Sequence, residues 1–425
     1  MDLLLKNCRT LAGEKDIYIK DGIFTKIIDS GTEHDFGNCE IRDLAGAFVI
    51  PGITDPHVHV RDLNQKDKED WLSCSQAALN GGVTTIFDMP NTIPATDNLE
   101  SLNLKREVAE KSLVNYKFYL GANNDNIIEI DSILSSKPKD IAGIKLFLSS
   151  SSSNDIIDNR VSIVNLFKLA KKYDVVVAIH TEMQRCLNKW NDKIKDKTIE
   201  NHNQIRNREC AIEGTELVLD IAEKVGNKVL ICHVSTKEEL DLIREAKQKD
   251  VQVFCEVSPH HLMLNETIVK IVGNFAKVNP PLRTKEDNLA LLEAINDGTV
   301  DLIGTDHAPH QLTEKQQDYS LAPSGFPGLE TMLPILLNEV NKKNITLEKV
   351  VELTSANANN IFDLENKNIL AEGYDANFVI IDLDKKQIIK PENFKSKAKY
   401  SPFANTEVTG AVIETFVNRK KNKKK

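Results

Sequence analysis

The sequence predicts an α/β protein built on a (β/α)8 barrel of the TIM type, and three observations support this prediction. The chain has 425 residues, which is enough for a barrel of about 250 residues with further structure beside it. Short apolar runs alternate eight times with longer amphipathic stretches between residues 48 and 340. Most of these runs are continuously apolar and rich in Val and Ile, as in parallel strands covered on both faces. A doubly wound open sheet is the main alternative.

The eight expected barrel strands coincide with the apolar runs. They are Phe48–Thr54, Val83–Asp88, Tyr116–Leu120, Gly143–Leu148, Val175–His180, Lys228–His233, Val251–Val257 and Val300–Thr305. Helices are expected between them, for example at Asn98–Ser112, Val161–Tyr173, Glu209–Val225 and Lys237–Gln248. A run of five serines, Ser149–Ser153, follows the fourth strand, where barrel enzymes place active-site loops.

Both ends of the chain have a different pattern, with short alternating segments separated by turn residues such as Asp21-Gly22. The segments are Asp16–Ile19, Phe24–Ile28, Ala376–Asp382 and Glu407–Val417. We therefore predict a small β-sandwich domain assembled from residues 1–47 and 366–417, beside a barrel of residues 48–365. Residues 418–425 carry six Lys and Arg side chains and are expected to form a disordered basic tail.

The composition argues against several classes of protein. There are 54 Lys and Arg residues and 63 Asp and Glu residues, so the net charge is −9, which disfavours nucleic-acid binding. No apolar run reaches the roughly 18–20 residues of a membrane span, and the N-terminus does not resemble a secretory signal. We therefore expect a cytoplasmic protein without nucleic-acid or membrane partners. The seven cysteines are scattered and form no Cys-x-x-Cys pair, which predicts reduced thiols.

Metal-ligating side chains gather at the C-terminal ends of the predicted strands. His57 and His59 follow the first strand, and their spacing points both rings to one face. His180, His233 and Asp306 end the fifth, sixth and eighth strands. A His-x-His pair alone is a weak signal, but ligands from four strand ends of one barrel predict a metal site. Histidines satisfied within the core are the alternative, which does not explain why they share one rim.

Lys145 lies inside the otherwise apolar fourth strand, where an unpaired ammonium group is costly to bury. One solution is a neutral or chemically modified amine. A lysine that reacts with carbon dioxide, for example, becomes a carbamate whose two oxygens can bridge two cations. The other solution is an ion pair with an acidic residue of the barrel.

Together these residues resemble the amidohydrolase superfamily with a binuclear metal centre and, within it, the dihydroorotases. The resemblance covers nearly the whole chain and includes the motifs Gly81–Thr85, Asp88–Thr92, Val278–Arg283, Thr305–His310 and Gly373–Asn377. It implies two divalent metal ions, with zinc expected, and carbon dioxide for carboxylation of a lysine. By this resemblance one metal is held by His57, His59 and Asp306, the second by His180 and His233, and carboxylated Lys145 bridges them.

The activity implied is the reversible cyclisation of N-carbamoyl-L-aspartate to dihydroorotate in pyrimidine synthesis. Asp306 is expected to be the catalytic acid and base, and the forked guanidinium of Arg61 suits the substrate carboxylate. Related enzymes are often dimers, so a homodimer is compatible with the resemblance, although the sequence does not determine the oligomeric state. The resemblance completes the substrate pocket with Asn91, Asn279, His310, Ser324 and Gly325.

Other functions remain open at this point. Hydantoinases and dihydropyrimidinases act on rings without that carboxylate and are not expected to keep Arg61, and allantoinase is a further cyclic amidohydrolase. A non-catalytic, dihydroorotase-like scaffold would be expected to lack metal ligands, whereas every ligand position is filled here. The family commonly has an acidic residue, proline and glycine after the arginine, where this chain has Asp62-Leu63-Asn64, so we expect that turn to differ. We expect His260 and His261, at the end of the seventh strand, to have supporting or structural roles.

Overall fold

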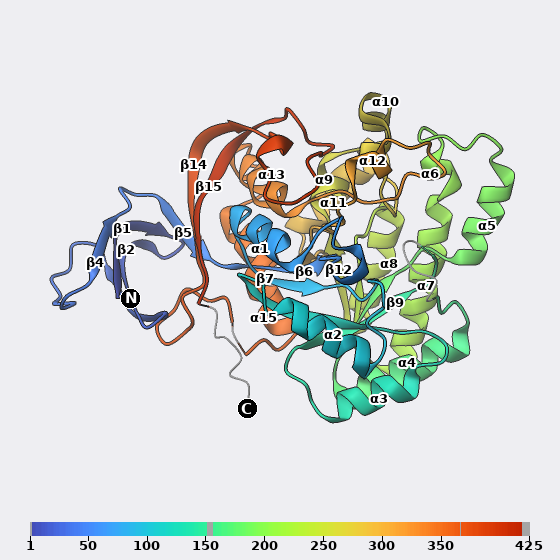
Figure 1. The fold of residues 1–425 in the computed structure, drawn as a ribbon, viewed down its shortest axis with the longest axis horizontal. Helices are drawn as coiled ribbons and strands as arrows, with labels where there is room; N and C mark the ends of the chain where they lie inside the picture. Colours follow the sequence, from blue (N-terminus) through green and yellow to red (C-terminus); the bar gives the residue numbers. More distant parts are fainter. Residues whose placement is uncertain (1, 151–155, 366, 419–425) are drawn as a thin grey trace.

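An eight-stranded parallel barrel forms the centre of the molecule (Figure 1), as seen in a computed structural model that describes residues 2–150, 156–365 and 367–418. The strands pair in chain order, and a parallel bridge between Val58 and His307 joins the last strand region to the first. The strands are β6 (Ile53–Val58), β7 (Val83–Asp88), β8 (Asn115–Gly121), β9 (Ile141–Phe147), β10 (Val176–His180), β11 (Val229–Ile231), β12 (Val253–Val257) and β13 (Leu302–Ile303).

Helices follow the strands and cover the outside of the barrel, which confirms the predicted fold class (Figure 1). The main helix of each unit is α1 (Trp71–Asn80), α2 (Leu99–Ala109), α3 (Ile127–Ser135), α4 (Arg160–Tyr173), α7 (Arg208–Val225), α8 (Lys237–Gln248), α11 (Lys285–Asn296) or α13 (Leu329–Asn341). Shorter helices are α5 (Gln184–Lys193), α6 (His202–Ile205), α9 (Pro259–Met263), α10 (Val269–Val272), α12 (Leu312–Lys315), α14 (Leu347–Val351) and α15 (Asn357–Ile361). Capping boxes begin several of them, as where Thr236 and Glu239 cap α8.

The second sheet is built from both ends of the chain and lies beside the barrel (Figure 1). Its strand order is β15-β14-β5-β1-β2-β3, and β4 pairs with β1. The strands are β1 (Leu3–Thr10), β2 (Gly13–Lys20), β3 (Ile23–Asp29), β4 (Glu40–Asp43), β5 (Phe48–Pro51), β14 (Phe378–Ile388) and β15 (Glu407–Phe416). The predicted sheet from both termini is therefore present, while the domain boundaries stay a prediction. Ser151–Ser153 and the basic residues 419–425 lie outside the described residues.

The first predicted barrel strand was wrong in extent. The apolar run Phe48–Thr54 spans two strands, because β5 pairs with β14 in the terminal sheet and the barrel strand β6 begins at Ile53. A continuous apolar run does not reveal where the chain passes from one sheet to the other, since both sheets bury these residues.

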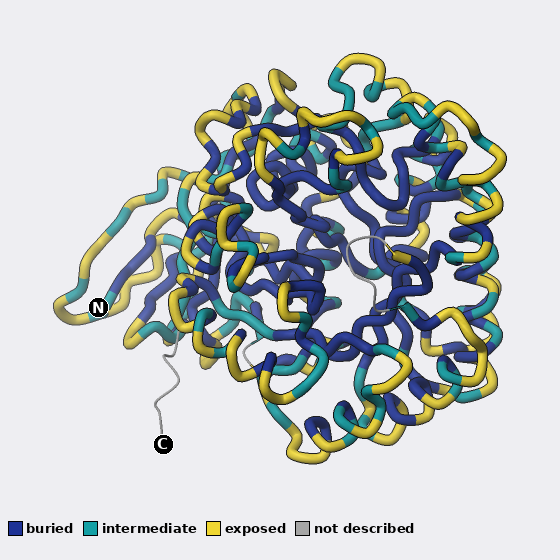
Figure 2. Tube along the Cα trace, turned by 45° about the vertical axis from the view of Figure 1, so that its right-hand side comes forward, coloured by how far each residue is buried: buried dark blue, intermediate teal, exposed yellow. Residues whose placement is uncertain are grey.

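Buried residues fill the middle of the barrel, and exposed residues gather on the outer helices and loops (Figure 2). The large core lies between strands and helices. A second cluster includes Phe87, Tyr119, Ala178, Leu230 and Leu302, contributed by five different strands, and it contacts residues of α15. We infer that this cluster fills the barrel interior and supports the strand ends above it.

The prediction of reduced thiols was wrong for one pair of cysteines. Cys186 at the start of α5 and Cys210 at the start of α7 form a disulfide, and both are buried. The two helix starts are adjacent because Met183 N–H donates to the Cys210 carbonyl at 3.0 Å. A separation of 24 residues gives no sign of this contact in the sequence. Among the described helices, none is long and apolar enough to cross a bilayer.

Candidate active site

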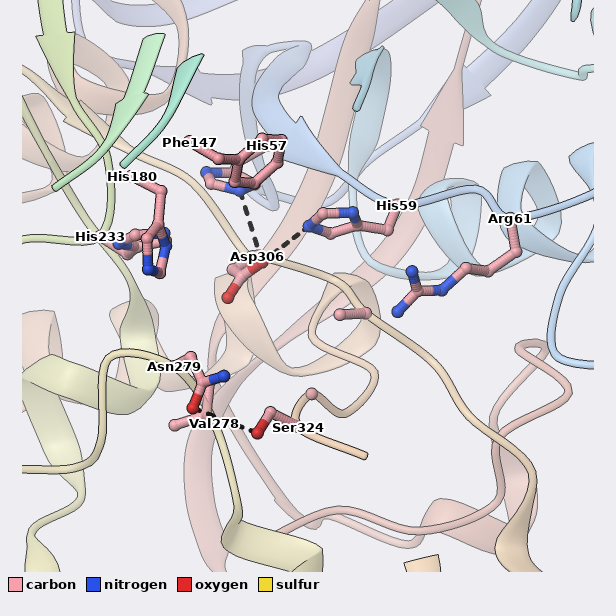
Figure 3. A pocket seen from close by; sticks show the side chains of 12 residues that line it. His57, His59, Arg61, Phe147, His180, His233, Val278, Asn279, Asp306 and Ser324 are labelled. Atoms are coloured by element: carbon pink, nitrogen blue, oxygen red, sulfur yellow. Dashed lines mark hydrogen bonds and ion pairs between the residues drawn. The ribbon is translucent and has the colours of Figure 1, made fainter. Parts of the chain in front are cut away.

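One pocket opens at the C-terminal ends of β6, β9, β10, β11 and β13 (Figure 3). Its cavity volume is about 30 Å³. Its lining residues are His57, His59, Arg61, Phe147, His180, His233, Val278, Asn279, Asp306, Ala308, Ser324 and Gly325. This is the end of the barrel at which the sequence placed the functional side chains.

His57, His59 and Asp306 converge on one point of the pocket. Asp306 Oδ1 lies 3.1 Å from His59 Nε2 and 3.4 Å from His57 Nε2 (Figure 3). All three residues are buried, and their ligand-type atoms lie within 4.8 Å of one another, close enough to share a metal ion. Burial alone would raise the pKa of Asp306, but His57 and His59 hold it well below its ordinary value. The carboxylate is therefore ionised, as a metal ligand or proton acceptor must be.

His180 and His233 form a neighbouring pair, with His180 Nδ1 3.1 Å from His233 Nε2. The opposite nitrogen of His180, Nε2, lies 3.0 Å from Glu182 Oε2, which also accepts from Arg206 Nη2 at 2.6 Å. Although burial would raise the pKa of Glu182, Arg206 and His180 lower it below its ordinary value. The ionised carboxylate thus favours a proton on Nε2 of His180 and leaves Nδ1 to face His233.

Three residues of the site leave their strands through the left-handed region of the backbone map. The φ angles are 67° at Arg61, 38° at His233 and 48° at Asp306. Non-glycine residues seldom adopt such angles, and they concentrate where surrounding structure enforces a functional geometry. Here the kinks interrupt the alternation of side chains along a strand, and all three side chains line the pocket.

His57 is held from behind by an acid on β12, two strands away around the barrel. Its Nδ1 lies 2.7 Å from Glu256 Oε1, and both side chains are buried. Burial lowers the pKa of His57, but the carboxylates of Glu256 and Asp306 together outweigh burial, so that the pKa is raised to about 10. With the Nδ1 proton directed at Glu256, Nε2 is the nitrogen that faces Asp306.

Lys145 lies under the pocket and does not line it. The side chain is fully buried, and its Nζ contacts Cys232 Sγ at 3.1 Å and the ring of Phe147 at 5.1 Å. Within the described part of the chain, no carboxylate forms an ion pair with Lys145. The alternative in which an acidic residue of the barrel neutralises it therefore has no support.

Arg61 is almost fully buried and extends into the pocket (Figure 3). Its Nε donates to the Pro309 carbonyl at 3.3 Å, and its Nη2 lies 3.1 Å from His310 Nε2. Burial and the Arg61 charge lower the pKa of His310 to about 3, so the ring is neutral. Asn91 lies behind His59, with its Oδ1 2.7 Å from His59 Nδ1. Asn91 and His310 therefore contact pocket residues but do not line the pocket themselves.

The turn after Arg61 continues at positive φ, with 51° at Asp62 and 49° at Leu63. Proline is fixed near −65°. The family's proline could not adopt the conformation of Leu63, so this turn must differ from one that contains it.

The opposite wall is a loop whose carbonyls bind two buried lysines. Ser324 Oγ donates to Asn279 Oδ1 at 3.1 Å. Lys315 Nζ donates to the carbonyls of Pro323 at 2.8 Å and Gly325 at 2.9 Å, and Lys277 Nζ donates to the Ala322 carbonyl at 2.6 Å. Gly325 has φ +118°, and a Cβ there would lie 2.7 Å from Ala308, so glycine is required at this close approach.

Nine of the twelve predicted site residues line the pocket, whereas Lys145, Asn91 and His310 lie one layer behind it. His260 and His261 are buried outside the lining, and His261 Nε2 lies 3.0 Å from the Pro280 carbonyl. Sequence reasoning did not identify the supporting residues Glu182, Glu256, Lys277 and Lys315. The only signal for Glu256 was a single acid within an apolar run, Val251–Val257.

Comparison with known proteins identifies the class. Residues 48–420 match the amidohydrolase family, and the chain belongs to that family. It is 36% identical over 426 residues to a dihydroorotase of Methanosphaera stadtmanae, covering 98% of this chain and 95% of the relative. It is 35% identical over 431 residues to a dihydroorotase of Bacillus cereus, covering 99% and 98%. Within the amidohydrolases the chain therefore belongs with the dihydroorotases, and it is a cyclic amide hydrolase.

Solved structures of related enzymes have the same fold. The L-hydantoinase (dihydropyrimidinase) from Arthrobacter aurescens superposes with a TM-score of 0.91 at 30% identity, covering 98% of this chain and 94% of that one. The D-hydantoinase (dihydropyrimidinase) from a Thermus species gives a TM-score of 0.88 at 26% identity, with the same coverage. The barrel and the sheet from both termini thus occur together in this group of enzymes.

Proposed function

We propose that this protein is a metal-dependent dihydroorotase that closes N-carbamoyl-L-aspartate to dihydroorotate and reopens it. The observation that carries the proposal is the presence of a buried guanidinium, Arg61, in the same pocket as His57, His59, His180, His233 and Asp306. A ring that carries a carboxylate needs both a cationic anchor and a group that attacks its amide. The curated relatives named dihydroorotase support this substrate class.

The residues present fit two divalent cations. Neutral imidazole and carboxylate are the usual ligands of zinc-type ions, and three ligand atoms from His57, His59 and Asp306 already converge. His180 and His233 place two ring nitrogens together beside them. Such cations, for which zinc is our proposal, would activate water for attack and polarise the amide carbonyl of the ring.

We propose that Lys145 carries a carbon dioxide-derived carbamate that bridges the two cation sites. The support is its burial without an acidic partner among the described residues, in contact with Cys232, the residue before His233. A carbamate replaces an uncompensated buried cation by an anion, which the two metal ions would neutralise.

The remaining residues would bind the substrate and move one proton. Asp306 Oδ1 faces His57 and His59, which leaves Oδ2 to take the proton of the attacking water and return it to the ring nitrogen. Arg61 would anchor the carboxylate as a forked donor. Asn279 and the main chain of Ser324 and Gly325 would face the other side of the ring.

The test is turnover of dihydroorotate, followed at 230 nm, by purified protein whose metal content has been measured. Hydantoin, dihydrouracil and allantoin are assayed in parallel. We expect hydrolysis of dihydroorotate with two metal ions per chain and much weaker action on the uncharged rings. Efficient hydrolysis of hydantoin or dihydrouracil with no turnover of dihydroorotate would instead establish the second candidate, a hydantoinase-type enzyme, which the structural likeness favours.

A further inference from the structure

A single carboxylate oxygen of Glu256 touches both halves of the candidate metal centre. Glu256 lies on β12 and is fully buried. Its Oε1 lies 2.7 Å from Nδ1 of His57, which belongs to the group with His59 and Asp306. The same Oε1 accepts the main-chain N–H of His233, the partner of His180, at 3.1 Å.

The contact with His57 determines which ring nitrogen is free. A histidine that binds a metal ion keeps one ring proton, and an acceptor 2.7 Å from Nδ1 would retain that proton on Nδ1 of His57. Nε2, which faces Asp306, is then the nitrogen left to bind the metal ion. Acids placed behind ligating histidines orient the ring in this way and increase the basicity of the coordinating nitrogen.

The contact with His233 acts on the backbone. His233 has φ 38°, a left-handed conformation that a non-glycine residue adopts only when its surroundings compensate the cost. Its main-chain N–H is directed at Glu256 Oε1, a charged acceptor that binds more strongly than a neutral one. Glu256 therefore stabilises the kink from which the His233 side chain reaches the pocket.

Gly304, just after β13, provides the space for this arrangement. A Cβ at residue 304 would lie 2.9 Å from Glu256 Cδ and 3.0 Å from His57 Cβ. Any side chain there would press on the acid and the histidine together. The position of Gly304 is a second, independent sign that the His57–Glu256 contact is built into the barrel.

We infer that Glu256 is a positioning residue for both metal sites, holding one ligand of each through a single oxygen. This inference rests on the proposed function only in taking His57 and His233 as metal ligands. Glu256 itself is outside the pocket lining, so it acts through the two histidines and not on the substrate.

The test measures Zn2+ affinity by competition with a chelating dye, independently of activity. Glu256→Ala removes both contacts, and we expect each of the two sites to bind Zn2+ about 10- to 100-fold more weakly than in the wild type. Glu256→Gln keeps an acceptor oxygen for both donors and loses only the charge, so a smaller loss is expected at both sites. Gly304→Ala leaves every ligand in place but crowds the pair, and it should also weaken binding.

The matched control is Glu330→Gln. Glu330 is a buried acid that also accepts main-chain N–H groups, from Lys395 and Ser396, and it does not line the pocket. The Zn2+ affinity of the Glu330→Gln variant should equal that of the wild type. Circular dichroism checks that each variant folds. If Glu256→Ala does not fold, the Zn2+ affinities of Glu256→Gln and Gly304→Ala test the inference.

Wild-type affinity at both sites in Glu256→Ala and Glu256→Gln would overturn the inference, and so would a loss confined to one site. The proposed function fails separately. It fails if the wild-type protein binds two Zn2+ ions and does not turn over dihydroorotate, an outcome that leaves the comparison of Glu256 variants intact.

Discussion

Replacing Arg61 by methionine tests the assignment of the substrate most directly. The guanidinium is almost fully buried, and its contacts with the Pro309 carbonyl and His310 hold it in place beside the pocket. Methionine fills similar space without a charge or a hydrogen-bond donor. The substrate carboxylate would then enter a buried site with no cation to receive it.

The expected effect follows from this burial. Deleting one partner of a buried, hydrogen-bonded charge pair costs roughly 2–5 kcal/mol. Because about 1.4 kcal/mol corresponds to a factor of ten, kcat/KM for dihydroorotate should fall by about 30-fold to about 5,000-fold. Most of this loss should appear in KM, since the carboxylate keeps its charge throughout the reaction.

The assay compares dihydroorotate with dihydrouracil, which lacks the carboxylate, and adds the inhibition constant of orotate as a measure of anion binding. The Arg61→Lys variant keeps the charge without the fork and should lie between wild type and Arg61→Met. If Arg61→Met lost activity equally on both rings and bound orotate as tightly as the wild type, Arg61 would not be the group that binds the substrate carboxylate.

Three further predictions follow from buried cations and a buried histidine. Lys145→Ala should lower kcat at least about 100-fold through loss of bound metal, and short carboxylates such as acetate should partly restore activity. Turnover of the Lys145→Ala variant at the wild-type rate without added carboxylate would contradict a bridging role. Lys315→Met removes ammonium–carbonyl hydrogen bonds worth roughly 1.5–3 kcal/mol each. KM for dihydroorotate should therefore rise by at least about tenfold. An unchanged KM would show that the Ser324–Gly325 loop keeps its position without Lys315. Burial lowers the pKa of His202 from 6.5 to about 3, so between these values the unfolded chain binds a proton that the folded chain does not. The free energy of unfolding therefore falls with falling pH in that window, and His202→Gln, followed by denaturant unfolding, should reduce the slope by about 1.4 kcal/mol per pH unit; an unaltered slope contradicts the assignment.

The arrangement of the barrel was predictable because it follows from the apolar periodicity and the order of the strands along the chain. Val83–Asp88 was predicted with the bounds of β7, and α8 ends where Lys237–Gln248 ends. The division of Phe48–Thr54 between two sheets was not predictable, since both strands are apolar and only pairing with β14 separates them. The Cys186–Cys210 disulfide was missed for a related reason, because the contact depends on the packing of α5 against α7.

The candidate site was predictable where its residues have unusual chemistry at strand ends. His57 and His59 are conspicuous because of their spacing, and Lys145 because of its apolar surroundings. Glu256 and Lys315 are not conspicuous, since single acids and lysines occur throughout a chain of 28% charged residues. Their roles depend on being buried against particular atoms, which only the three-dimensional structure reveals.

The likeness to hydantoinases shows why fold alone does not assign the substrate. The TM-score of 0.91 to an L-hydantoinase means that the barrel, the terminal sheet and the strand ends superpose. A binuclear centre can open several cyclic amides, so in the function proposed here the histidines and Asp306 would define the reaction and leave the ring undetermined. Discrimination must come from a group that meets the carboxylate found on dihydroorotate. Arg61 lines the pocket, and its guanidinium is cationic independently of pH. We therefore predict that the choice among cyclic amides depends on Arg61 and on its contact with His310, and that mutation of these residues changes specificity and spares the chemistry.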